Sequence, residues 1–216
     1  MLARVARLLL DAVAPLRCAA CDSACDGPLC APCIDALNAL PVPTPRRIRH
    51  GIAFAGFEFE ERVRSALHRG KYGADRSALE ALGALTAARL DEEKTKTRLS
   101  VPDAVVAVPL GRRRRRQRGY NQSELIARVI ADSRRLPLLG GLHRMRDTAP
   151  QSARAEDARR TNVAGAFAWQ GMAIERAHLW LVDDVLTTGA TLEAAATALE
   201  AAGASRIDAV VVAMVL

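Results

Sequence analysis

Twelve residues near the C-terminal end of this 216-residue chain carry the clearest chemical signal. The segment 180–191 reads WLVDDVLTTGAT, in which an apolar run leads to two adjacent acids and then to a turn rich in hydroxyls and glycine. This order predicts a buried strand, paired carboxylates at its end, and a phosphate-cradling loop ahead of a helix. A ligand that carries a phosphate and neighbouring hydroxyls, such as a ribose phosphate, suits this chemistry.

Asp183 and Asp184 are the candidate catalytic pair. Two adjacent carboxylates repel each other unless a metal ion, a basic neighbour or hydroxyl donors offset the repulsion, and ribose hydroxyls are donors spaced for this task. The turn behind them offers backbone N–H groups ahead of a helix, which form a ready anion site. A plain strand-to-helix connection capped by threonines is the alternative interpretation. The residues that we assign to the phosphate are Thr187, Thr188, Gly189, Ala190 and Thr191.

A block of arginines follows a short apolar run at 104–108. Such a block repels itself, so we expect it to lack regular structure unless an anion is bound. Guanidinium groups suit phosphate because their planar fork can bond two of its oxygens. The anion is either pyrophosphate or a nucleic-acid backbone, and a solvated charged loop is the alternative. The residues concerned are Pro109, Leu110, Gly111, Arg112, Arg113, Arg114, Arg115, Arg116 and Arg118.

All five cysteines lie between residues 18 and 33. Cys18, Cys21, Cys30 and Cys33 have the spacing C-x2-C-x8-C-x2-C, and four thiolates match the tetrahedral coordination of Zn²⁺. Disulfides are the weaker interpretation because the sequence gives no sign of secretion. Cys25 can substitute for Cys21, but we expect it to be a spectator. A closed site of four thiolates predicts a structural zinc ion without a catalytic role.

Alternating strands and helices must position these residues. Apolar runs at 104–108, 179–182 and 207–216 predict buried strands, and helical spacing at 123–134 and 192–199 predicts helices between them. The alternation predicts a parallel sheet covered by helices on both faces. Upstream, the sequence predicts a strand or hairpin edge, a short helix, a longer helix and, before them, a proline-rich linker. The linker spans 41–51, the strand or hairpin edge 52–59, the short helix 61–71 and the longer helix 77–90.

The composition is that of an ordinary globular protein with a basic balance. Hydrophobic residues make up 50% and charged residues 25%, and the net charge of +7 favours anionic partners without choosing among phosphate, pyrophosphate and nucleic acid. No apolar run reaches the about 18 residues that a membrane span needs. The N-terminal segment has a leucine run, but Asp11 interrupts it. We therefore expect a short amphipathic helix in a cytoplasmic protein rather than a signal peptide.

Several motifs, in order along nearly the whole chain, resemble the ComF family of type I phosphoribosyltransferase-like proteins. The segment 180–191 is similar to the signature for phosphoribosyl pyrophosphate (PRPP), and VAVPLGRRRRRQRGYNQSELIA at 106–127 is similar to the family's pyrophosphate loop. The segment 151–167 and the cysteine-bearing N-terminus also resemble the corresponding parts of ComF-like sequences. The resemblance implies a type I phosphoribosyltransferase fold, with a five-stranded parallel sheet flanked by helices. We expect a zinc module over 1–45 and the phosphoribosyltransferase-like domain over 46–216.

The same resemblance implies roles for the site residues. Asp183 and Asp184 would face the ribose hydroxyls of PRPP, residues 187–191 would hold its 5′-phosphate, and Lys71 would lie near its pyrophosphate. Mg²⁺ would accompany PRPP, and ribosyl phosphate would pass to an acceptor as pyrophosphate leaves. The family's association with natural transformation also implies contact with single-stranded DNA or competence proteins. A non-catalytic single-stranded-DNA-binding protein and a PRPP sensor on the same fold are the alternatives.

Overall fold

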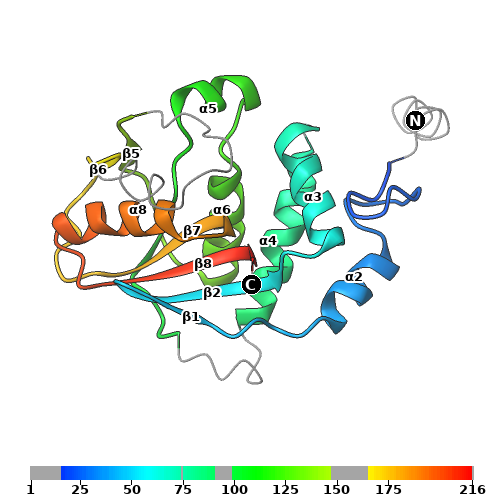
Figure 1. The fold of residues 1–216 in the computed structure, drawn as a ribbon, viewed down its shortest axis with the longest axis horizontal. Coiled ribbons are helices and arrows are strands. Elements are labelled where there is room, and N and C mark those ends of the chain that lie inside the picture. Colours follow the sequence, from blue (N-terminus) through cyan, green and yellow to red (C-terminus); the bar gives the residue numbers. More distant parts are fainter. Residues whose placement is uncertain (1–15, 74, 91–98, 147–164, 216) are drawn as a thin grey trace.

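A six-stranded sheet in the order β1-β2-β8-β7-β3-β4 forms the centre of the molecule (Figure 1). The computed structural model describes residues 16–73, 75–90, 99–146 and 165–215. Strand β1 (Arg46–Ile48) pairs antiparallel with β2, and the other five strands are parallel. These five are β2 (Gly51–Glu58), β3 (Ala104–Ala107), β4 (Leu138–Leu139), β7 (His178–Leu186) and β8 (Arg206–Met214). The expected five-stranded parallel sheet is confirmed, with one antiparallel strand added at its edge.

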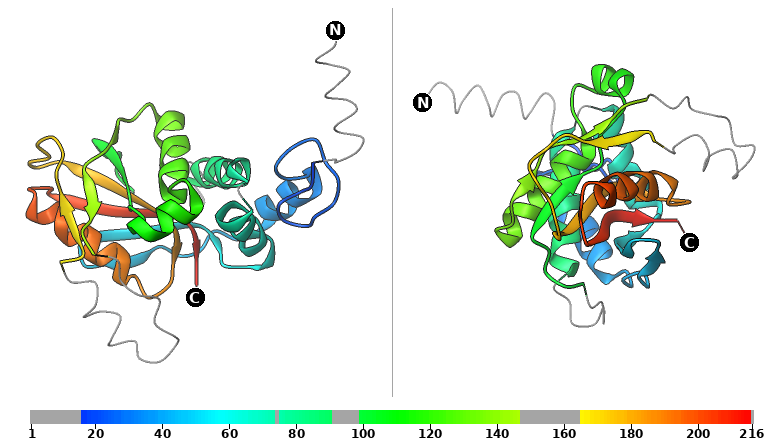
Figure 2. Two further views of the ribbon diagram at one scale, coloured as in Figure 1. Left: turned by 90° about the horizontal axis from the view of Figure 1, so that it is seen from above. Right: turned by 90° about the vertical axis from the view of Figure 1, so that its left-hand side faces the viewer.

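Successive side chains of the central strands point into two different hydrophobic cores. In β7, Trp180 and Val182 belong to one core, whereas Leu179 and Leu181 belong to the other. The first core is covered by α3 (Glu61–Tyr72), α4 (Arg76–Leu90) and α6 (Gln122–Arg134). The second lies under α8 (Ala190–Ala201) and a small sheet of β5 (Leu142–Arg144) and β6 (Phe167–Trp169). The left-hand view of Figure 2 shows α6 and α8 on opposite sides of the sheet. Burial on both faces explains why these strands are continuous apolar runs in the sequence.

The cysteine-bearing loop and helix α2 (Ala31–Ala39) lie at one end of the molecule, beside α3 (Figure 1). Cys18, Cys33 and Leu37 are buried in the same core as α3 and α4. The buried guanidinium of Arg89 donates hydrogen bonds to the carbonyl oxygen of Leu37 in α2 and, at 2.9 Å, to that of Gly56 in β2. This end of the chain is therefore packed onto the sheet and its helices through a shared core.

Two expectations from the sequence are wrong. The proline-rich segment 41–51 contains β1, because the residues that follow Pro45 pair with β2 across an antiparallel ladder. The arginine block forms helix α5 (Arg112–Arg118), which ends at Gly119 in the left-handed conformation, with a φ of 79°. Arginine has a high intrinsic helix propensity, and this outweighs the repulsion between neighbouring guanidinium groups.

Other expectations fall on parts of the chain that lie outside the described residues. These are the amphipathic helix near the N-terminus and most of the segment 151–167. Among the helices that the structure does describe, none has the length and hydropathy needed to cross a bilayer.

Candidate anion-binding site and cysteine cluster

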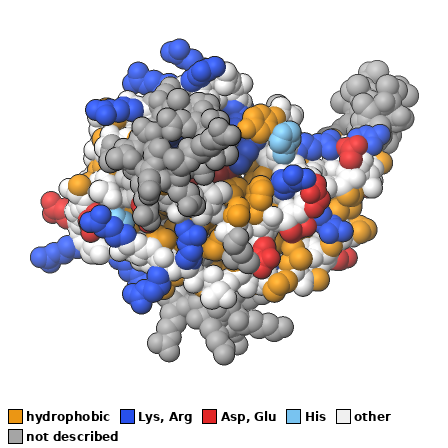
Figure 3. Space-filling model, viewed as in Figure 1, with side chains coloured by type: hydrophobic (Ala, Val, Ile, Leu, Met, Phe, Trp, Pro, Cys, Tyr) orange, Lys and Arg blue, Asp and Glu red, His pale blue; other side chains and the backbone are white. Residues whose placement is uncertain are grey.

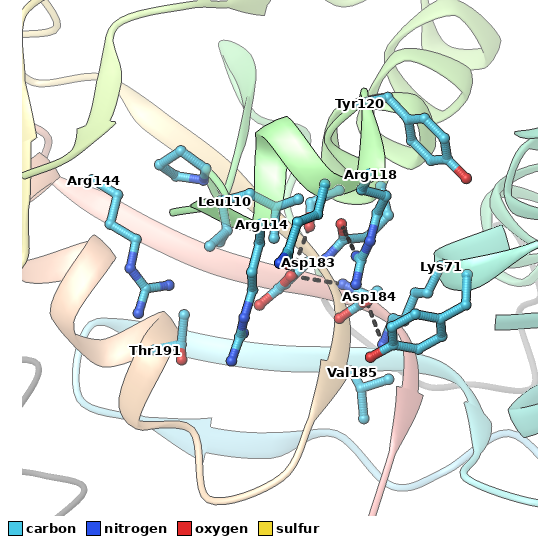
Figure 4. A pocket seen from close by; sticks show the side chains of 16 residues that line it. Lys71, Leu110, Arg114, Arg118, Tyr120, Arg144, Asp183, Asp184, Val185 and Thr191 are labelled. Carbon is cyan, nitrogen blue, oxygen red and sulfur yellow. Dashed lines mark hydrogen bonds and ion pairs between the residues drawn. The ribbon is translucent and has the colours of Figure 1, made fainter. Parts of the chain in front are cut away.

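A cavity of about 630 Å³ opens at the carboxyl ends of β3 and β7 (Figure 4). Ligands of open parallel sheets bind at this edge, because the connections to the following helices leave a crevice there. Side chains from α3, α5, α6, β5, β7 and α8 line it. The structure brings together eight of the residues selected from the sequence: Lys71, Pro109, Leu110, Arg114, Arg118, Asp183, Asp184 and Thr191.

The two acids of the pair make different contacts within β7, which continues past them to Leu186. The Asp183 carboxylate accepts hydrogen bonds from the Ser123 hydroxyl at 2.7 Å and from the Asp184 N–H at 2.9 Å. The Asp184 carboxylate forms an ion pair with the Lys71 ammonium, with 2.6 Å between Oδ2 and Nζ. Asp183 is 8% exposed and Asp184 is 7% exposed, so the pair lies at the floor of the cavity.

Burial of Asp183 affects its ionisation. Loss of hydration, together with the charge of neighbouring Asp184, raises the pKa of Asp183 to about 7. The hydrogen bonds from Ser123 and from the Asp184 N–H, and the charge of Lys71, oppose this rise. The site therefore holds two carboxylates at its floor of which one titrates near neutral pH, which is a common property of functional sites.

The loop after β7 turns sharply into α8. Gly189 has a φ of 85°, a left-handed conformation that glycine adopts without strain, and it is the N-cap of α8. Thr191, in the first turn of α8, lines the cavity, and Thr187 and Thr188 are exposed beside it. The Arg46 guanidinium, from β1, donates to the carbonyl oxygens of Thr187 and Thr188. The loop thus precedes the N-terminus of a helix that buries one face, as the sequence predicts.

The arginines of α5 divide into two groups. Arg114 and Arg118 line the cavity, and Arg118 donates to the Gln122 side chain at 2.5 Å and lies over the ring of Tyr72. Four others are exposed and do not line the cavity, and Figure 3 shows basic side chains gathered at this end of the molecule. These four are Arg112, Arg113, Arg115 and Arg116.

Four residues that the sequence did not single out also belong to the site or support it. Ser123 bonds Asp183, Tyr72 and Arg144 line the cavity, and Arg46 holds the loop. Arg144 comes from β5 and approaches from the side of Thr191 (Figure 4). Ser123 lies in the segment 106–127 that resembles the family's pyrophosphate loop, but its bond to Asp183, like the positions of the other three residues, arises from tertiary packing.

The four cysteines selected from their spacing form a cluster. The sulfur atoms of Cys18, Cys21, Cys30 and Cys33 all lie within 4.8 Å of one another, and those of Cys21 and Cys30 are 3.7 Å apart. Tetrahedral zinc with Zn–S bonds of about 2.3 Å places its sulfurs about 3.8 Å apart, so the cluster fits this ion. Cys25 instead contacts the Gly27 carbonyl and is outside the cluster. Four cysteines that can hold a metal ion are therefore present where the sequence predicts them.

Contacts with Ser23 lower the pKa of Cys21 to about 6, which favours the thiolate that a metal binds. Burial raises the pKa of Cys33, so this thiol stays protonated unless a cation draws the proton off.

Solved structures and curated protein sequences were compared with this chain. The fold is α/β, with the parallel sheet and flanking helices expected of a type I phosphoribosyltransferase. Solved structures that are similar to part of this chain include "Structure of the allosteric regulatory enzyme of purine biosynthesis" (22% identity, covering 63% of this chain and 25% of that chain, TM-score 0.42). They also include the hypoxanthine-guanine phosphoribosyl transferase of L. donovani (16% identity, covering 63% of this chain and 71% of that chain, TM-score 0.34). No family model matches the chain.

Curated relatives give the more particular result. The chain is 31% identical over 151 residues to "DNA utilization protein YhgH" of Escherichia coli K12, covering 66% of this chain and 63% of that protein. It is 31% identical over 123 residues to "Competence protein F" of Haemophilus influenzae, covering 54% of this chain and 52% of that protein. The chain thus spans less than two thirds of the length of these relatives. The chain is a homologue of these proteins, in agreement with the resemblance seen in its sequence.

Proposed function

We propose that this protein binds PRPP with Mg²⁺ in the cavity and transfers or recognises its ribosyl phosphate. The observation that carries the proposal is the meeting of three features in one cavity. Buried adjacent carboxylates form its floor, the first turn of a helix lies on one side, and Lys71, Arg114 and Arg118 supply positive charge. A ribose hydroxyl pair, a 5′-phosphate and a pyrophosphate are the ligand groups that match these features.

Each group of residues has a separate task in this proposal. Asp183 and Asp184 accept hydrogen bonds from the ribose hydroxyls and so orient the ring. The loop 187–191 anchors the 5′-phosphate, and the cationic side chains stabilise the negative charge that develops on departing pyrophosphate. The carboxylates and the phosphate oxygens are hard donors that suit Mg²⁺, whose contribution would be to neutralise charge on the pyrophosphate. Lys71 already neutralises Asp184, so ligand hydroxyls must compete with this ion pair.

Calorimetric titration with Mg²⁺ and PRPP tests the proposal. We expect wild-type affinity in the micromolar range and a loss of at least about tenfold in Asp184→Asn, which keeps the shape of the side chain but removes its charge. Asp132→Asn is a matched control, because Asp132 is exposed on α6 and does not line the cavity. Equal affinities in all three proteins would contradict the assignment of the acidic pair. Release of pyrophosphate when candidate bases are added distinguishes an enzyme from a PRPP sensor.

The cysteine cluster completes the proposal. We assign it to a structural Zn²⁺ in an N-terminal module over 1–45, with the phosphoribosyltransferase-like domain over 46–216. Four thiolates fill the coordination of zinc and leave no open position for a substrate. The module would therefore support the fold without taking part in chemistry.

A second candidate function, binding of single-stranded DNA during DNA uptake, is favoured by the exposed arginines of α5. Four guanidinium groups outside the cavity give a nucleic-acid backbone a place to bind that PRPP does not use. The names of the relatives, which refer to DNA utilization and competence, agree with this candidate.

A further inference from the structure

Arg46 connects the edge strand β1 to the loop that precedes α8. Its Nη1 donates to the carbonyl oxygen of Thr187 at 3.2 Å, and its Nη2 donates to that of Thr188 at 3.1 Å. Arg46 is paired with Ala53 across the antiparallel ladder, so both side chains are on the α8 face of the sheet. Further along, His50 contacts the Thr197 hydroxyl at 3.3 Å. The segment 46–50 therefore contacts both the loop that precedes α8 and α8 itself.

These two hydrogen bonds determine which way the peptide groups of the loop point. In a trans peptide the C=O and the N–H point in opposite directions. Because the carbonyls of Thr187 and Thr188 face Arg46, the N–H groups of Thr188 and Gly189 point away from it. Within the described residues, neither of these N–H groups donates a hydrogen bond. Two adjacent donors ahead of a helix are therefore available to an anion.

The geometry also explains why residue 189 is a glycine. A Cβ atom at this position would lie 3.1 Å from Nη2 of Arg46, closer than a side chain ordinarily approaches, and the left-handed φ would be strained for any other residue. The loop and the guanidinium are thus fitted to each other.

We infer that Arg46 is a positioning residue for the phosphate-binding loop. This inference rests on the proposed function. Arg46 does not touch the ligand: it holds two carbonyls so that the opposite N–H groups face the 5′-phosphate, and it adds positive charge behind the loop. The planar fork of arginine bonds both carbonyls at once, whereas lysine presents a single point charge.

The test separates the two ends of PRPP. Calorimetry measures the binding of ribose 5-phosphate, which carries the 5′-phosphate, and of Mg²⁺-pyrophosphate, which lacks it. We expect Arg46→Met and Arg46→Lys each to weaken ribose 5-phosphate binding by about tenfold and to leave pyrophosphate binding unchanged. Arg47→Met is the matched control: it removes the same charge from the next residue, which pairs with Ile52 on the other face of the hairpin.

Each outcome is decisive. A loss that is confined to ribose 5-phosphate cannot come from general unfolding, because pyrophosphate binds the same folded chain. Wild-type affinity in Arg46→Lys, with a loss in Arg46→Met, would show that charge alone acts and would overturn the positioning role. If both variants bind ribose 5-phosphate as wild type does, the inference fails while the proposed function stands. If wild-type protein binds neither ligand, both fail.

Discussion

Ionisation of Asp183 couples the stability of the protein to pH. The folded state holds the Asp183 proton more tightly than the unfolded chain does, since burial raises the pKa from 3.8 to about 7. The stabilising contribution of this proton is complete below about pH 4, decreases as the pH rises, and is lost above about pH 7. The wild-type protein should therefore become less stable through this group between pH 5 and pH 8.

We predict that Asp183→Asn removes this decrease in stability with rising pH. Asparagine cannot ionise, and its side-chain oxygen can still accept from Ser123 and from the N–H of Asp184. The variant should match the wild type at about pH 4 and exceed its Tm by at least about 3 °C at about pH 8, as measured by differential scanning calorimetry. Asp132→Asn, an exposed control, should shift the Tm equally at both pH values. An Asp183→Asn effect that does not change with pH would contradict the raised pKa.

At the residue scale, the sequence was informative where a motif is continuous. Asp183, Asp184 and Thr191 come from one run of twelve residues, in which residue order alone indicates a strand end, a turn and a helix start. Ser123 and Arg144 could not be predicted, because they reach the site from α6 and β5 through packing of distant segments. Arg46 shares this limitation: its partners lie more than 140 residues away in the chain.

At the scale of elements, helix α5 carries arginines that line the cavity and arginines that lie outside it. Arg114 lines the cavity, whereas four neighbours are exposed outside it. We predict that Arg114→Gln weakens Mg²⁺-PRPP binding but scarcely changes binding of single-stranded DNA. Glutamine keeps a good helix propensity, so α5 should persist. Calorimetry with each ligand checks this expectation.

The complementary variant replaces the four exposed residues with glutamine. It should leave PRPP binding close to wild type. Its affinity for single-stranded DNA should fall less steeply with salt: the magnitude of the slope of log affinity against log salt should decrease by up to about 3, since each backbone contact contributes about 0.7. Fluorescence anisotropy over a salt series measures this slope. A PRPP loss as large as that of Arg114→Gln would show that the division of α5 into two sets is wrong. The four residues are Arg112, Arg113, Arg115 and Arg116.

The elements that the sequence predicted correctly are those whose burial leaves a pattern. Strands β3, β7 and β8 are buried on both faces, so each is an apolar run, and α6 carries an apolar stripe toward the sheet. Helix α5 and strand β1 leave no such pattern, because neither buries an apolar face of its own. Their formation depends on arginine propensity in one case and on pairing with β2 in the other.

At the scale of the whole molecule, the cysteine cluster and the sheet share one core. Cys18, Cys33 and Leu37 pack with α3 and α4, and Arg89 joins α2 to β2. We predict that the protein contains stoichiometric zinc, and that removing it lowers the Tm of the entire chain in a single transition. A separate early transition with an unchanged main one would indicate an independent module.

Two variants test the ligand set of the cluster. Cys18→Ser should lose zinc and stability together, whereas Cys25→Ser, outside the cluster, should retain both. Native mass spectrometry and calorimetry measure the two quantities. Full zinc content in Cys18→Ser would count against the assigned ligands.

The two edges of the central sheet bear on how the protein behaves at high concentration. Both edge strands are short: β1 has three residues and β4 has two. The most apolar strands, β7 and β8, lie in the interior of the sheet. Long, flat, apolar edges recruit strands from other molecules, and short or charged edge strands prevent this. Arginines at 46 and 47 place charge on one of these edges. The folded chain should thus resist edge-to-edge aggregation, although its last strand, exposed in an unfolded chain, is a strongly aggregation-prone segment.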